Sequence, residues 1–396
     1  MDVISSGGKM LRVAVIGVGF VGPHHVDAIR RTGYADVVAL GGTDERQLSL
    51  RAAALGVARA TRDVASILAD RSIDVVHICT PNASHVELAR AALEAGKHVV
   101  VEKPVALDSS SADGLVALAA ARRRHAMVAF TYRGYPMVRR ARRLVRDGEL
   151  GDLRLIHGQY LQDWLSEESD YNWRVDPELG GASGAVADIG CHWFDTVEFV
   201  SGRRVEAVFA DLATVVSGRD RPVDAAAVEA GVEPPTTRVA VVSEDAAVIL
   251  VRFEGGPIGS CVVSQVSPGH KNDLVFELAG RKRSMCWRQE SPERLWLGSR
   301  ASLETLVRTP DQLPRPGVPE LPAGHPEGWG EALSDLLRPF YAAVARDEEP
   351  PSAAAEADYP TLVDGARAVR FVEAVLASAR EQRWVSLTGG KSTSPT

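Results

Sequence analysis

The sequence lacks any apolar run that approaches the roughly 20 residues a membrane-spanning helix needs. Residues 1–10 are mostly polar and lack the apolar stretch of a signal peptide, so we expect a disordered leader there. We expect a second disordered segment at the Gly- and Ser-containing tail, residues 388–396. A membrane partner is therefore not expected.

An excess of basic residues is also absent, since the formal net charge is -7. Nucleic-acid-binding domains show a basic patch or stripe. The two short basic runs, Arg122–Arg124 and Arg139–Arg143, are flanked by Ala, Leu and Val, which is typical of a solvated helix face. The charge pattern therefore predicts no nucleic-acid partner.

The 4 cysteines show no metal-ligand or redox spacing. Three of them lie in apolar surroundings, which is typical of small buried side chains. We therefore expect no metal site, and a reducing, cytoplasmic location. The four are Cys79, Cys191, Cys261 and Cys286.

A length of 396 residues with 45% hydrophobic content predicts two globular domains. Up to about residue 135, short β-branched runs alternate with helical patterns, which indicates βαβ units and a doubly wound parallel sheet of the Rossmann type. We place this domain at residues 11–135. The expected strands are Leu11–Ile16, Asp36–Leu40, Asp74–Cys79, His98–Val101 and Ala126–Thr131, and the expected helices are Pro23–Arg31, Glu45–Leu55, Asp63–Leu68, Asn82–Ala95 and Ser110–Arg124.

The pattern changes after about residue 150, where strands follow one another with turn signals between them. This favours an open, mostly antiparallel sheet in an α/β domain over residues 136–387. We take Ser217–Thr237 as a long loop and Pro310–Pro326 as a link. The expected strands are Leu153–Leu161, Val205–Val215, Arg238–Phe253, Gly259–Ser267, Asp273–Gly280 and Met285–Trp287, and the expected helices are Ala187–Val200, Trp329–Ala345 and Pro360–Arg380.

The turn after the first strand reads Gly17-Val18-Gly19-Phe20-Val21-Gly22. In such a turn the first glycine permits a sharp bend, the second lets backbone N–H groups approach a pyrophosphate, and the third lets the helix pack closely on the strand. The N-terminus of the following helix adds partial positive charge. With βαβ units on both sides, the loop predicts a dinucleotide site rather than a plain structural turn.

The acidic residue that usually follows the second strand is displaced, because the chain reads Leu40-Gly41-Gly42-Thr43-Asp44-Glu45-Arg46. Asp44 could bind the adenosine ribose, which would favour NAD, or cap the next helix. Thr43 and Arg46 could instead hold a 2′-phosphate, which would favour NADP. The choice between NAD and NADP stays open.

Two further clusters follow buried strands, at the edge where open α/β sheets bind ligands. Thr80-Pro81-Asn82, with His85, follows the third strand, and Glu102-Lys103-Pro104 follows the fourth. Asn82 could also cap the next helix, and Glu102 with Lys103 could form a surface ion pair. A lysine beside a cofactor can present its ammonium to a substrate oxygen.

In the second domain Asp188 and His192 are four residues apart on an expected helix, and Asp195 lies three beyond His192. Residues at these spacings share a helix face. A carboxylate beside an imidazole tunes its basicity, as a general base for a hydroxyl proton requires. The alternative is an ordinary core histidine.

Taken together and in order, these motifs resemble the glucose–fructose oxidoreductase / inositol dehydrogenase / MocA family from about Arg12 to Val385. The resemblance implies an N-terminal Rossmann domain that binds NAD or NADP and a C-terminal α/β domain whose open sheet serves in a homo-oligomer, a dimer or tetramer. It implies that Lys103 polarises the reacting hydroxyl, that His192 takes its proton, and that Asp188 orients His192. It also implies a cis bond between Lys103 and Pro104.

Further segments look like the branch of this family that oxidises pyranosides and anhydrosugars such as levoglucosan. The resemblance places Trp173 and Arg174 near the nicotinamide and a sugar beside Gln162, Asp163 and Trp164. An amide, an acid and an indole suit a polyol, although Trp164 could also be ordinary core. The remaining substrate candidates are Tyr132, Arg133 and His325.

The expected activity is hydride transfer between a nicotinamide and a secondary hydroxyl of a sugar, glycoside, anhydrosugar or cyclitol. Two alternatives share the fold. An NAD-dependent glycosidase would oxidise its substrate transiently to ease elimination, and a catalytically silent regulator would only bind a sugar or a dinucleotide. The intact set of Lys103, Asp188 and His192 disfavours the regulator.

Overall fold

The computed structural model describes residues 10–223, 235–309, 321–351 and 357–387. The chain divides into two compact units, residues 1–140 with 307–369 and residues 141–306 with 370–396. The sequence placed a single boundary at 135/136, whereas the first unit also takes in residues 307–369. The leader at 1–9, the tail at 388–396 and part of the link at 310–320 lie outside the described residues.

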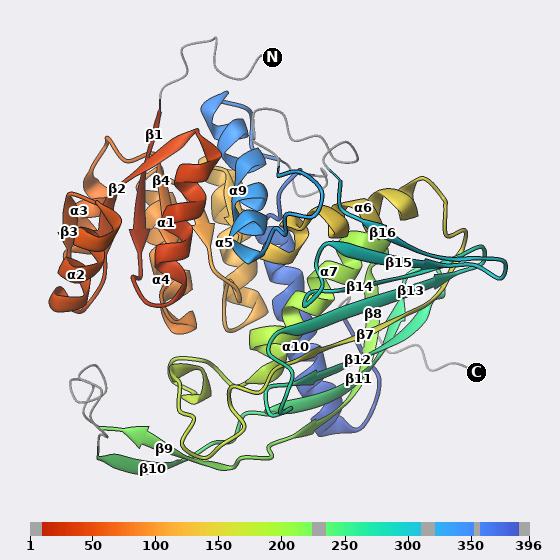
Figure 1. Cartoon of the computed structure of the whole chain (residues 1–396). Helices are drawn as coiled ribbons and strands as arrows, with labels where there is room; N and C mark the ends of the chain where they lie inside the picture. The colour runs from red at the N-terminus through yellow and green to blue at the C-terminus, as the bar shows by residue number, and fades with distance from the viewer. Residues whose placement is uncertain (1–9, 224–234, 310–320, 352–356, 388–396) are drawn as a thin grey trace. The chain divides into compact units, whose positions relative to one another are not determined.

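The first unit is built on a six-stranded sheet of order β3-β2-β1-β4-β5-β6 (Figure 1). All of its neighbouring strands run parallel, which confirms the expected doubly wound sheet. The strands are β1 (Leu11–Ile16), β2 (Ala35–Gly41), β3 (Arg59–Thr61), β4 (Val75–Ile78), β5 (His98–Val101) and β6 (Ala126–Val128). The helices are α1 (Val21–Thr32), α2 (Glu45–Leu55), α3 (Val64–Ala69), η1 (Asn82–Ser84), α4 (His85–Glu94), α5 (Ser109–Arg122), η2 (Thr131–Gly134), α6 (Pro136–Arg146), α9 (Trp329–Ala345) and α10 (Leu362–Glu381). Helices α6 and α10 begin in this unit and end in the second.

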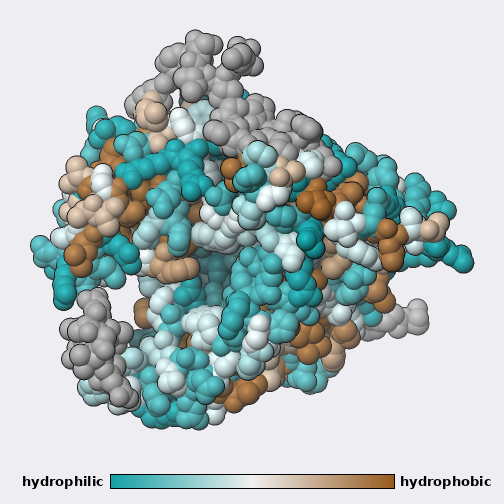
Figure 2. All heavy atoms as spheres, in the orientation of Figure 1, coloured by the Kyte–Doolittle hydropathy of each residue, from teal (hydrophilic) through white to brown (hydrophobic). Residues whose placement is uncertain are grey.

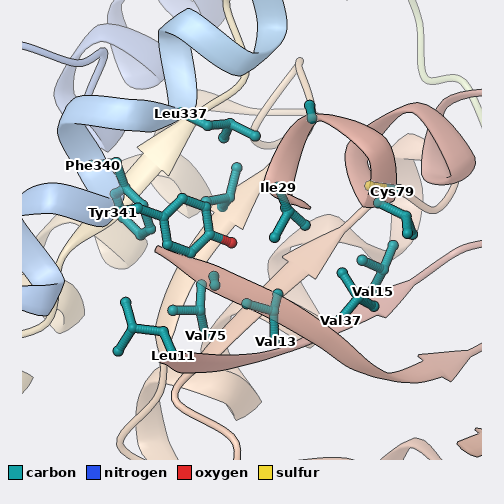
Figure 3. Close-up of a cluster of buried hydrophobic side chains, with 14 of the residues drawn as sticks. Leu11, Val13, Val15, Ile29, Val37, Val75, Cys79, Leu337, Phe340 and Tyr341 are labelled. Atoms are coloured by element: carbon teal, nitrogen blue, oxygen red, sulfur yellow. The ribbon is translucent and has the colours of Figure 1, made fainter. Parts of the chain in front are cut away.

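The core of the first unit lies between the central strands, α1 and α9 (Figure 3). Val13, Val15 and Val75 of the strands, with Ile29 of α1, are fully buried. Leu337, Phe340 and Tyr341 of α9 close this core from the other side. A parallel strand buried on both faces reads as a continuous apolar run, and each fully buried aliphatic side chain contributes about 1.5–3 kcal/mol to stability.

The second unit contains a nine-stranded sheet of order β16-β15-β14-β13-β7-β12-β11-β8-β17. The pairings across β14, β13, β7 and across β12, β11, β8 are antiparallel, while β7 and β12 run parallel. This mixed, mostly antiparallel sheet confirms the second half of the expected fold. Its strands are β7 (Leu153–Leu161), β8 (Val205–Ala213), β11 (Ala246–Phe253), β12 (Ile258–Ser264), β13 (Asp273–Gly280), β14 (Ser284–Arg288), β15 (Arg294–Gly298), β16 (Leu303–Val307) and β17 (Val385–Ser386).

Helical segments cover one face of this sheet. A π-helical turn, η4 (Val186–Gly190), leads into α7 (Cys191–Ser201), which contacts β7 and β13. Phe194 of α7 stacks on Phe371 of α10 at a centroid distance of 4.6 Å. Ser378 of α10 accepts the Ala210 N–H of β8 at 3.0 Å. A further 3-10 turn, η3 (Trp173–Val175), lies in the long connection after β7.

Two expectations for the second unit are wrong. Residues 238–253 do not form one strand, because β10 (Thr236–Ala240) and β11 are separate. Residues 217–237 are not only a loop, because β9 (Gly218–Pro222) pairs antiparallel with β10; residues 224–234 lie outside the described part. The break before β11 has a local cause, since the Asp245 carboxylate accepts the N–H groups of Val215 and Val216 at 2.7 and 2.9 Å.

Four short strands, β3, β15, β16 and β17, were not predicted from the sequence. The expectation that three cysteines are small buried side chains is confirmed, because Cys79, Cys191 and Cys261 are buried free thiols. Within the described ranges, none of the helices combines the length and apolar character that crossing a bilayer requires.

Candidate active site

The glycine loop joins β1 to α1 through very close backbone packing. Gly17 has a φ of 98°, in the left-handed region that favours glycine, and a Cβ there would lie 2.4 Å from the Cys79 carbonyl oxygen. A Cβ at Gly22 would lie 2.1 Å from the Gly17 oxygen, whereas one at Gly19 would meet no atom within 4 Å. The first and third glycines therefore serve packing, and the second leaves its side open for a ligand to approach.

Phe20 stands beside this opening with 82% of its surface exposed. Its ring meets His24 edge-on at 5.2 Å, and His24 meets Trp329 of α9 at 5.5 Å. Val21, the remaining predicted member of the loop, is the first residue of α1. The helix N-terminus therefore follows the loop directly, as an anion site requires.

The end of β2 carries the residues expected at the adenosine ribose. Asp44 caps α2, because its Oδ1 accepts the Gln47 N–H at 2.9 Å. Capping the helix is one of the two roles expected of Asp44, and the cap uses one of its two carboxylate oxygens. Thr43 and Arg46 lie exposed on either side.

His85 connects the two loops that follow β4 and β5. It is fully buried, with Nε2 2.8 Å from the Thr80 oxygen and Nδ1 2.8 Å from the Pro104 oxygen. Asn82, after Pro81, begins η1 and is also buried. The bond from Lys103 to Pro104 is cis, as expected. The structure thus brings Thr80, His85 and the Glu102–Pro104 segment together at one edge of the sheet.

Glu102 has buried partners that sequence reasoning missed. Its Oε1 lies 2.9 Å from Nε2 of His25, and its Oε2 accepts the Lys103 N–H at 3.3 Å. His25 in turn contacts His77 through their Nδ1 atoms at 2.7 Å, and His77 Nε2 lies 2.7 Å from the Tyr341 hydroxyl. The available signals were a histidine within an otherwise apolar strand and the His24-His25 pair after the glycine loop.

Three more candidates of the first unit have partners of their own. Tyr132 is buried and stacks on Tyr135 at 5.9 Å. Arg133 donates to Asp364 at 3.0 Å; burial raises the pKa of that carboxyl, but Arg133 and the hydrogen bonds from Thr361 together lower it further, and the net shift is downward. His325 is exposed, with Nδ1 3.3 Å from the Pro322 oxygen.

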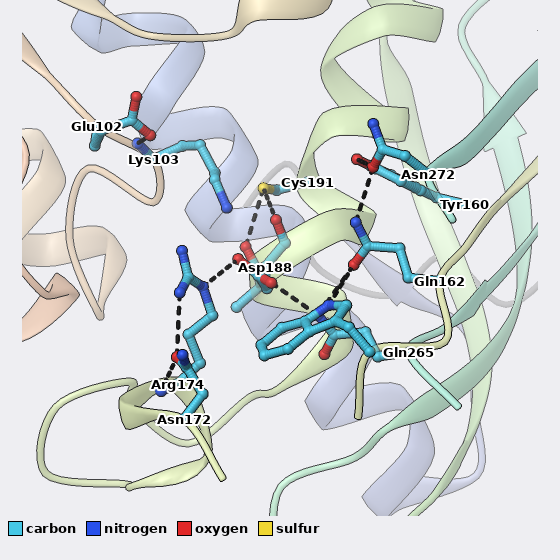
Figure 4. Close-up of polar contacts among 12 residues, drawn as sticks. Glu102, Lys103, Tyr160, Gln162, Asn172, Arg174, Asp188, Cys191, Gln265 and Asn272 are labelled. Atoms are coloured by element: carbon cyan, nitrogen blue, oxygen red, sulfur yellow. Dashed lines mark hydrogen bonds and ion pairs between the residues drawn. The ribbon is translucent and has the colours of Figure 1, made fainter. Parts of the chain in front are cut away.

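In the second unit the Asp188 carboxylate is held on both sides (Figure 4). Oδ1 accepts Arg174 Nε at 3.0 Å, and Oδ2 accepts Gln265 Nε2 at 2.8 Å. The Arg174 guanidinium lies over the Trp173 ring at 4.4 Å, and its Nη1 donates to Asn172 at 3.2 Å. The two residues expected at the nicotinamide are therefore linked to Asp188, Arg174 directly and Trp173 through Arg174.

His192 lies on the first turn of α7, with 9% of its surface exposed. Its ring faces that of Tyr160 at a centroid distance of 6.3 Å. Asp195 lies one turn further along the helix and is buried. The π-helical turn η4 carries Asp188 just before this helix, and such insertions are frequent at functional sites.

A chain of neutral polar groups continues from Asp188 through Gln265. Trp164 Nε1 donates to Gln162 Oε1 at 2.8 Å, and Gln162 Nε2 donates to Asn272 Oδ1 at 2.8 Å. The Tyr160 hydroxyl donates to the same Asn272 oxygen at 2.6 Å. Sequence reasoning found Gln162 and Trp164 but missed Gln265 and Asn272, which are over 100 residues away along the chain and meet them through the sheet.

Asp163 points to a different set of groups. Its Oδ2 accepts Lys271 Nζ at 2.5 Å and the Gly269 N–H at 3.1 Å, and Lys271 lowers the pKa of the carboxyl. Asp163 therefore bonds to the segment before β13. It is not part of the chain of neutral polar groups that contains Gln162, Gln265 and Asn272.

Glu244 anchors the segment that carries Asp188. Its Oε1 accepts the Ser183 hydroxyl at 2.6 Å and the Val186 N–H at 2.9 Å, at the start of η4. A carboxylate at a helix N-terminus compensates the unsatisfied N–H groups there. Among the described residues, no group of three or more His, Cys, Asp or Glu side chains could hold a metal ion.

Comparisons with known proteins identify the family of the chain. The model of the oxidoreductase family with an NAD-binding Rossmann fold matches residues 11–130, and that of the GFO/IDH/MocA C-terminal domain matches residues 138–286. Levoglucosan dehydrogenase of Pseudarthrobacter phenanthrenivorans is 30% identical over 84% of this chain and 84% of its own length. The chain belongs to the GFO/IDH/MocA family of oxidoreductases.

Other members of the family are similar over nearly the whole chain. D-apiose dehydrogenase of Paraburkholderia graminis is 26% identical over 98% of this chain and 92% of its own. The structure of a levoglucosan dehydrogenase complex with NADH and levoglucosan superposes with a TM-score of 0.85 at 27% identity, covering 96% of this chain and 100% of that one. An oxidoreductase domain protein from Kribbella flavida gives 0.85 at 30% identity, covering 96% and 99%. The family assignment confirms an NAD-binding Rossmann domain in the first unit.

The open side of Gly19 leads to a first prediction. In Gly19→Ala the new methyl group meets no protein atom within 4 Å, so the fold should keep its thermal midpoint. The methyl group does enter the space that a pyrophosphate approaches, so NADH should bind on the order of tenfold more weakly or worse. NADH fluorescence titration and thermal unfolding measure the two effects.

Gly22→Ala is the matched control for Gly19→Ala. Its Cβ would lie 2.1 Å from the Gly17 oxygen, so this variant should lose stability. Equal NADH affinity of Gly19→Ala and the unaltered protein would contradict the assignment of the loop.

The buried Glu244 leads to a prediction about pH. Burial raises the pKa of its carboxyl, against hydrogen bonds from Ser183 and Val186 that lower it. The folded state therefore holds this proton more tightly than the unfolded state, and stability from Glu244 is lost as the pH rises through the raised pKa. Glu244→Gln keeps an acceptor but no charge, so the unfolding free energy of the parent should fall relative to that of the variant as the pH rises above about 4.

Chemical denaturation across this pH range tests the effect. Glu254→Gln, at an exposed carboxyl, is the control and should follow the parent at every pH. Parallel curves for Glu244→Gln and the parent would show that Glu244 does not carry the raised pKa.

Proposed function

We propose that the protein is an NAD(P)-dependent dehydrogenase that acts on a secondary hydroxyl of a sugar, glycoside, anhydrosugar or cyclitol. The observation that carries the proposal is that Arg174 and Gln265 both bond to the carboxylate of Asp188. Asp188 lies on η4, and His192 lies on the first turn of α7, which follows η4 directly. The named relatives that oxidise levoglucosan and apiose, and a myo-inositol 2-dehydrogenase of Thermotoga maritima that is 26% identical over 63% of this chain, support the substrate class.

In the proposed reaction Lys103, Asp188 and His192 act on one substrate molecule. The Lys103 ammonium donates a hydrogen bond to the reacting hydroxyl oxygen and stabilises the negative charge that develops there. His192 takes the hydroxyl proton as the C–O single bond becomes a carbonyl, and Asp188 orients the substrate and His192. NAD or NADP, held at the glycine loop, would supply the hydride acceptor for the same carbon, and the products would be a ketone or lactone, the reduced cofactor and a proton. In the reverse direction the same groups return the proton.

The neutral polar groups beside Asp188 favour a polyol over a charged substrate. Gln162, Gln265 and Asn272 offer amide donors and acceptors, and Tyr160 adds a hydroxyl. Trp164, fixed by its bond to Gln162, offers an indole that can stack on the C–H face of a sugar ring. Few, well-placed polar groups of this kind set orientation in small-molecule sites. We therefore add Gln265 and Asn272 to the predicted sugar contacts.

Lys103→Ala should nearly abolish turnover and leave NADH binding intact, because the change removes the ammonium but leaves the glycine loop in place. The activity is found by following absorbance of the reduced cofactor with NAD and with NADP against a panel of sugars, glycosides, anhydrosugars and inositols. The loss should reach about 10²-fold or more. Unchanged turnover in this variant would overturn the assignment of Lys103.

The same assay separates the two alternatives. Glycoside cleavage without net release of NADH would indicate a glycosidase that uses transient oxidation. Binding of a sugar or of NADH with no turnover on any substrate of the panel would indicate a regulator.

We also propose that the uncovered face of the nine-stranded sheet joins two copies of this chain in a homo-oligomer. Along β11 side chains alternate strictly, and Val248 and Leu250 point outward with 53% and 45% of their surface exposed. Val262 and Ile258 are exposed on β12, which pairs with β11, and Leu155 is exposed on β7, which pairs with β12. The register places Val248 opposite Val262 and Ile258 opposite Leu155. The space-filling view shows hydrophobic patches over the strands of this unit (Figure 2). Contiguous exposed apolar surface of this kind marks an interaction site.

Val248→Asp should therefore shift the protein to a smaller sedimenting species, because it places a charge in the proposed interface. Val242→Asp is the control, since Val242 is 78% exposed but lies outside the sheet, between β10 and β11. Sedimentation velocity resolves the species. A parent protein that sediments as a monomer, or a Val248→Asp variant of unchanged size, would overturn the proposal.

A cytoplasmic location remains a prediction from the sequence. Its basis is that the four cysteines show no metal-ligand or redox spacing.

A further inference from the structure

We propose that a chain of three buried residues, Tyr341, His77 and His25, positions Glu102 and thereby Lys103. We call these three residues the buried histidine chain. They are positioning residues: none of them has exposed surface with which to meet a substrate. The inference rests on the proposed function, because it assigns a task to residues behind the proposed catalytic lysine.

The buried histidine chain crosses the first unit from α9 to the loop after β5. The Tyr341 hydroxyl of α9 lies 2.7 Å from His77 Nε2 of β4, and His77 Nδ1 lies 2.7 Å from His25 Nδ1 of α1. His25 Nε2 lies 2.9 Å from Glu102 Oε1. The other oxygen of Glu102 accepts the Lys103 N–H at 3.3 Å. Each bond therefore fixes the next group, and the last one fixes the backbone that carries the lysine.

Packing alone does not account for these residues. The other members of β4, Val75, Val76 and Ile78, are apolar and fully buried, so an apolar side chain would suit the position of His77. Burying a polar group is unfavourable unless it is hydrogen-bonded. The three side chains of the buried histidine chain have no exposed surface, whereas 13% of the Glu102 side chain is exposed. The polar groups thus extend from the core to one place, the Glu102–Lys103 loop.

The protonation states follow from the surroundings. His25 faces His77, Cys79 and Glu102; burial lowers its pKa, but the hydrogen bonds and charges of Cys79 and Glu102 raise it to about 10. Burial raises the pKa of the Cys79 thiol, and the charge and hydrogen bond of His25 lower it. Burial and His25 lower the pKa of His77. His25 is therefore an imidazolium that donates to both His77 and Glu102, and neutral His77 donates to the Tyr341 oxygen.

A charge-assisted bond to a carboxylate is stronger than a neutral one and holds its geometry more firmly. His77 keeps the His25 ring from turning away from Glu102, and Tyr341 does the same for His77. Loss of the Tyr341 hydroxyl should therefore loosen the Lys103 backbone without touching the glycine loop or the sugar contacts.

The same unit contains a matched pair that serves as a control. His125 Nδ1 lies 2.6 Å from the Tyr359 hydroxyl, and its Nε2 lies 2.8 Å from the backbone carbonyl oxygen of Glu348. Both rings are buried. His125 directly precedes β6, at the amino end of the sheet, whereas the Glu102–Lys103 loop follows the carboxyl end of β5. Tyr359→Phe therefore removes an equivalent buried hydroxyl at the opposite edge.

The experiment compares Tyr341→Phe and Tyr359→Phe in the full-length protein. Both should lower the thermal midpoint to a similar extent, because each leaves one buried histidine nitrogen without its hydroxyl. Only Tyr341→Phe should lower kcat, on the order of tenfold, since small displacements of a catalytic group are costly. The KM for the sugar and the Kd for NADH should stay within about twofold. His77→Gln, whose amide can both donate and accept, should retain more activity than His77→Phe.

Hydrogen exchange supplies a readout that needs no substrate. The Lys103 amide donates to Glu102, so Tyr341→Phe should speed its exchange and Tyr359→Phe should not. If the parent turns over no sugar, the proposed function fails while exchange still decides the present inference. Equal kcat and equal Lys103 exchange in the parent and Tyr341→Phe would overturn the inference. If Tyr341→Phe does not fold, the two His77 variants take its place in the same measurements.

Discussion

The close approach of two backbone segments, at Gly17 and at Cys79, is the constraint on which the first unit depends. The space between them would not admit even one methyl group, since a Cβ on Gly17 would lie 2.4 Å from the Cys79 oxygen. This contact sets the glycine loop directly beside the loop after β4. The Glu102 N–H, bonded to the Ile78 oxygen at 2.9 Å, brings the next loop to the same edge. Parallel strands thus deliver three loops to one place, as an open α/β sheet does at its ligand site.

The second unit fixes one carboxylate and places beside it the polar groups that we assign to a ligand. Asp188 uses both oxygens for this, one toward Arg174 and one toward Gln265. Gln265 follows β12 and Gln162 follows β7, and these two strands run parallel, so both amides arrive at the same end of the sheet. The parallel pairing of β7 with β12 therefore gathers groups that we assign to sugar recognition.

The sequence predicted the fold where the hydrophobic pattern and the local turn chemistry agreed. Strands β1 and β5 and helix α9 begin and end at the expected residues. The expectation failed where side-chain bonds interrupted an apolar run, as at Asp245, whose carboxylate binds the backbone of residues 215 and 216. It also missed the short strands at the sheet edges, which have too few residues to show a period of two. The return of residues 307–369 to the first unit has no local signature at all.

The candidate site divides in the same way. Glycine spacing, residues at strand ends and the spacing of Asp188 and His192 along a helix are local features, and they made Lys103, Asp188 and His192 candidates. Gln265 and Asn272 become visible only when the sheet register places them beside Gln162. His77 is the most instructive case, because a histidine within a run of buried aliphatic residues reads as a tolerated exception. Its partner Tyr341 lies 264 residues away, so no spacing rule connects them. A polar side chain in an apolar strand nevertheless must find a partner when it is buried, and following that requirement from His77 leads through His25 and Glu102 to the lysine.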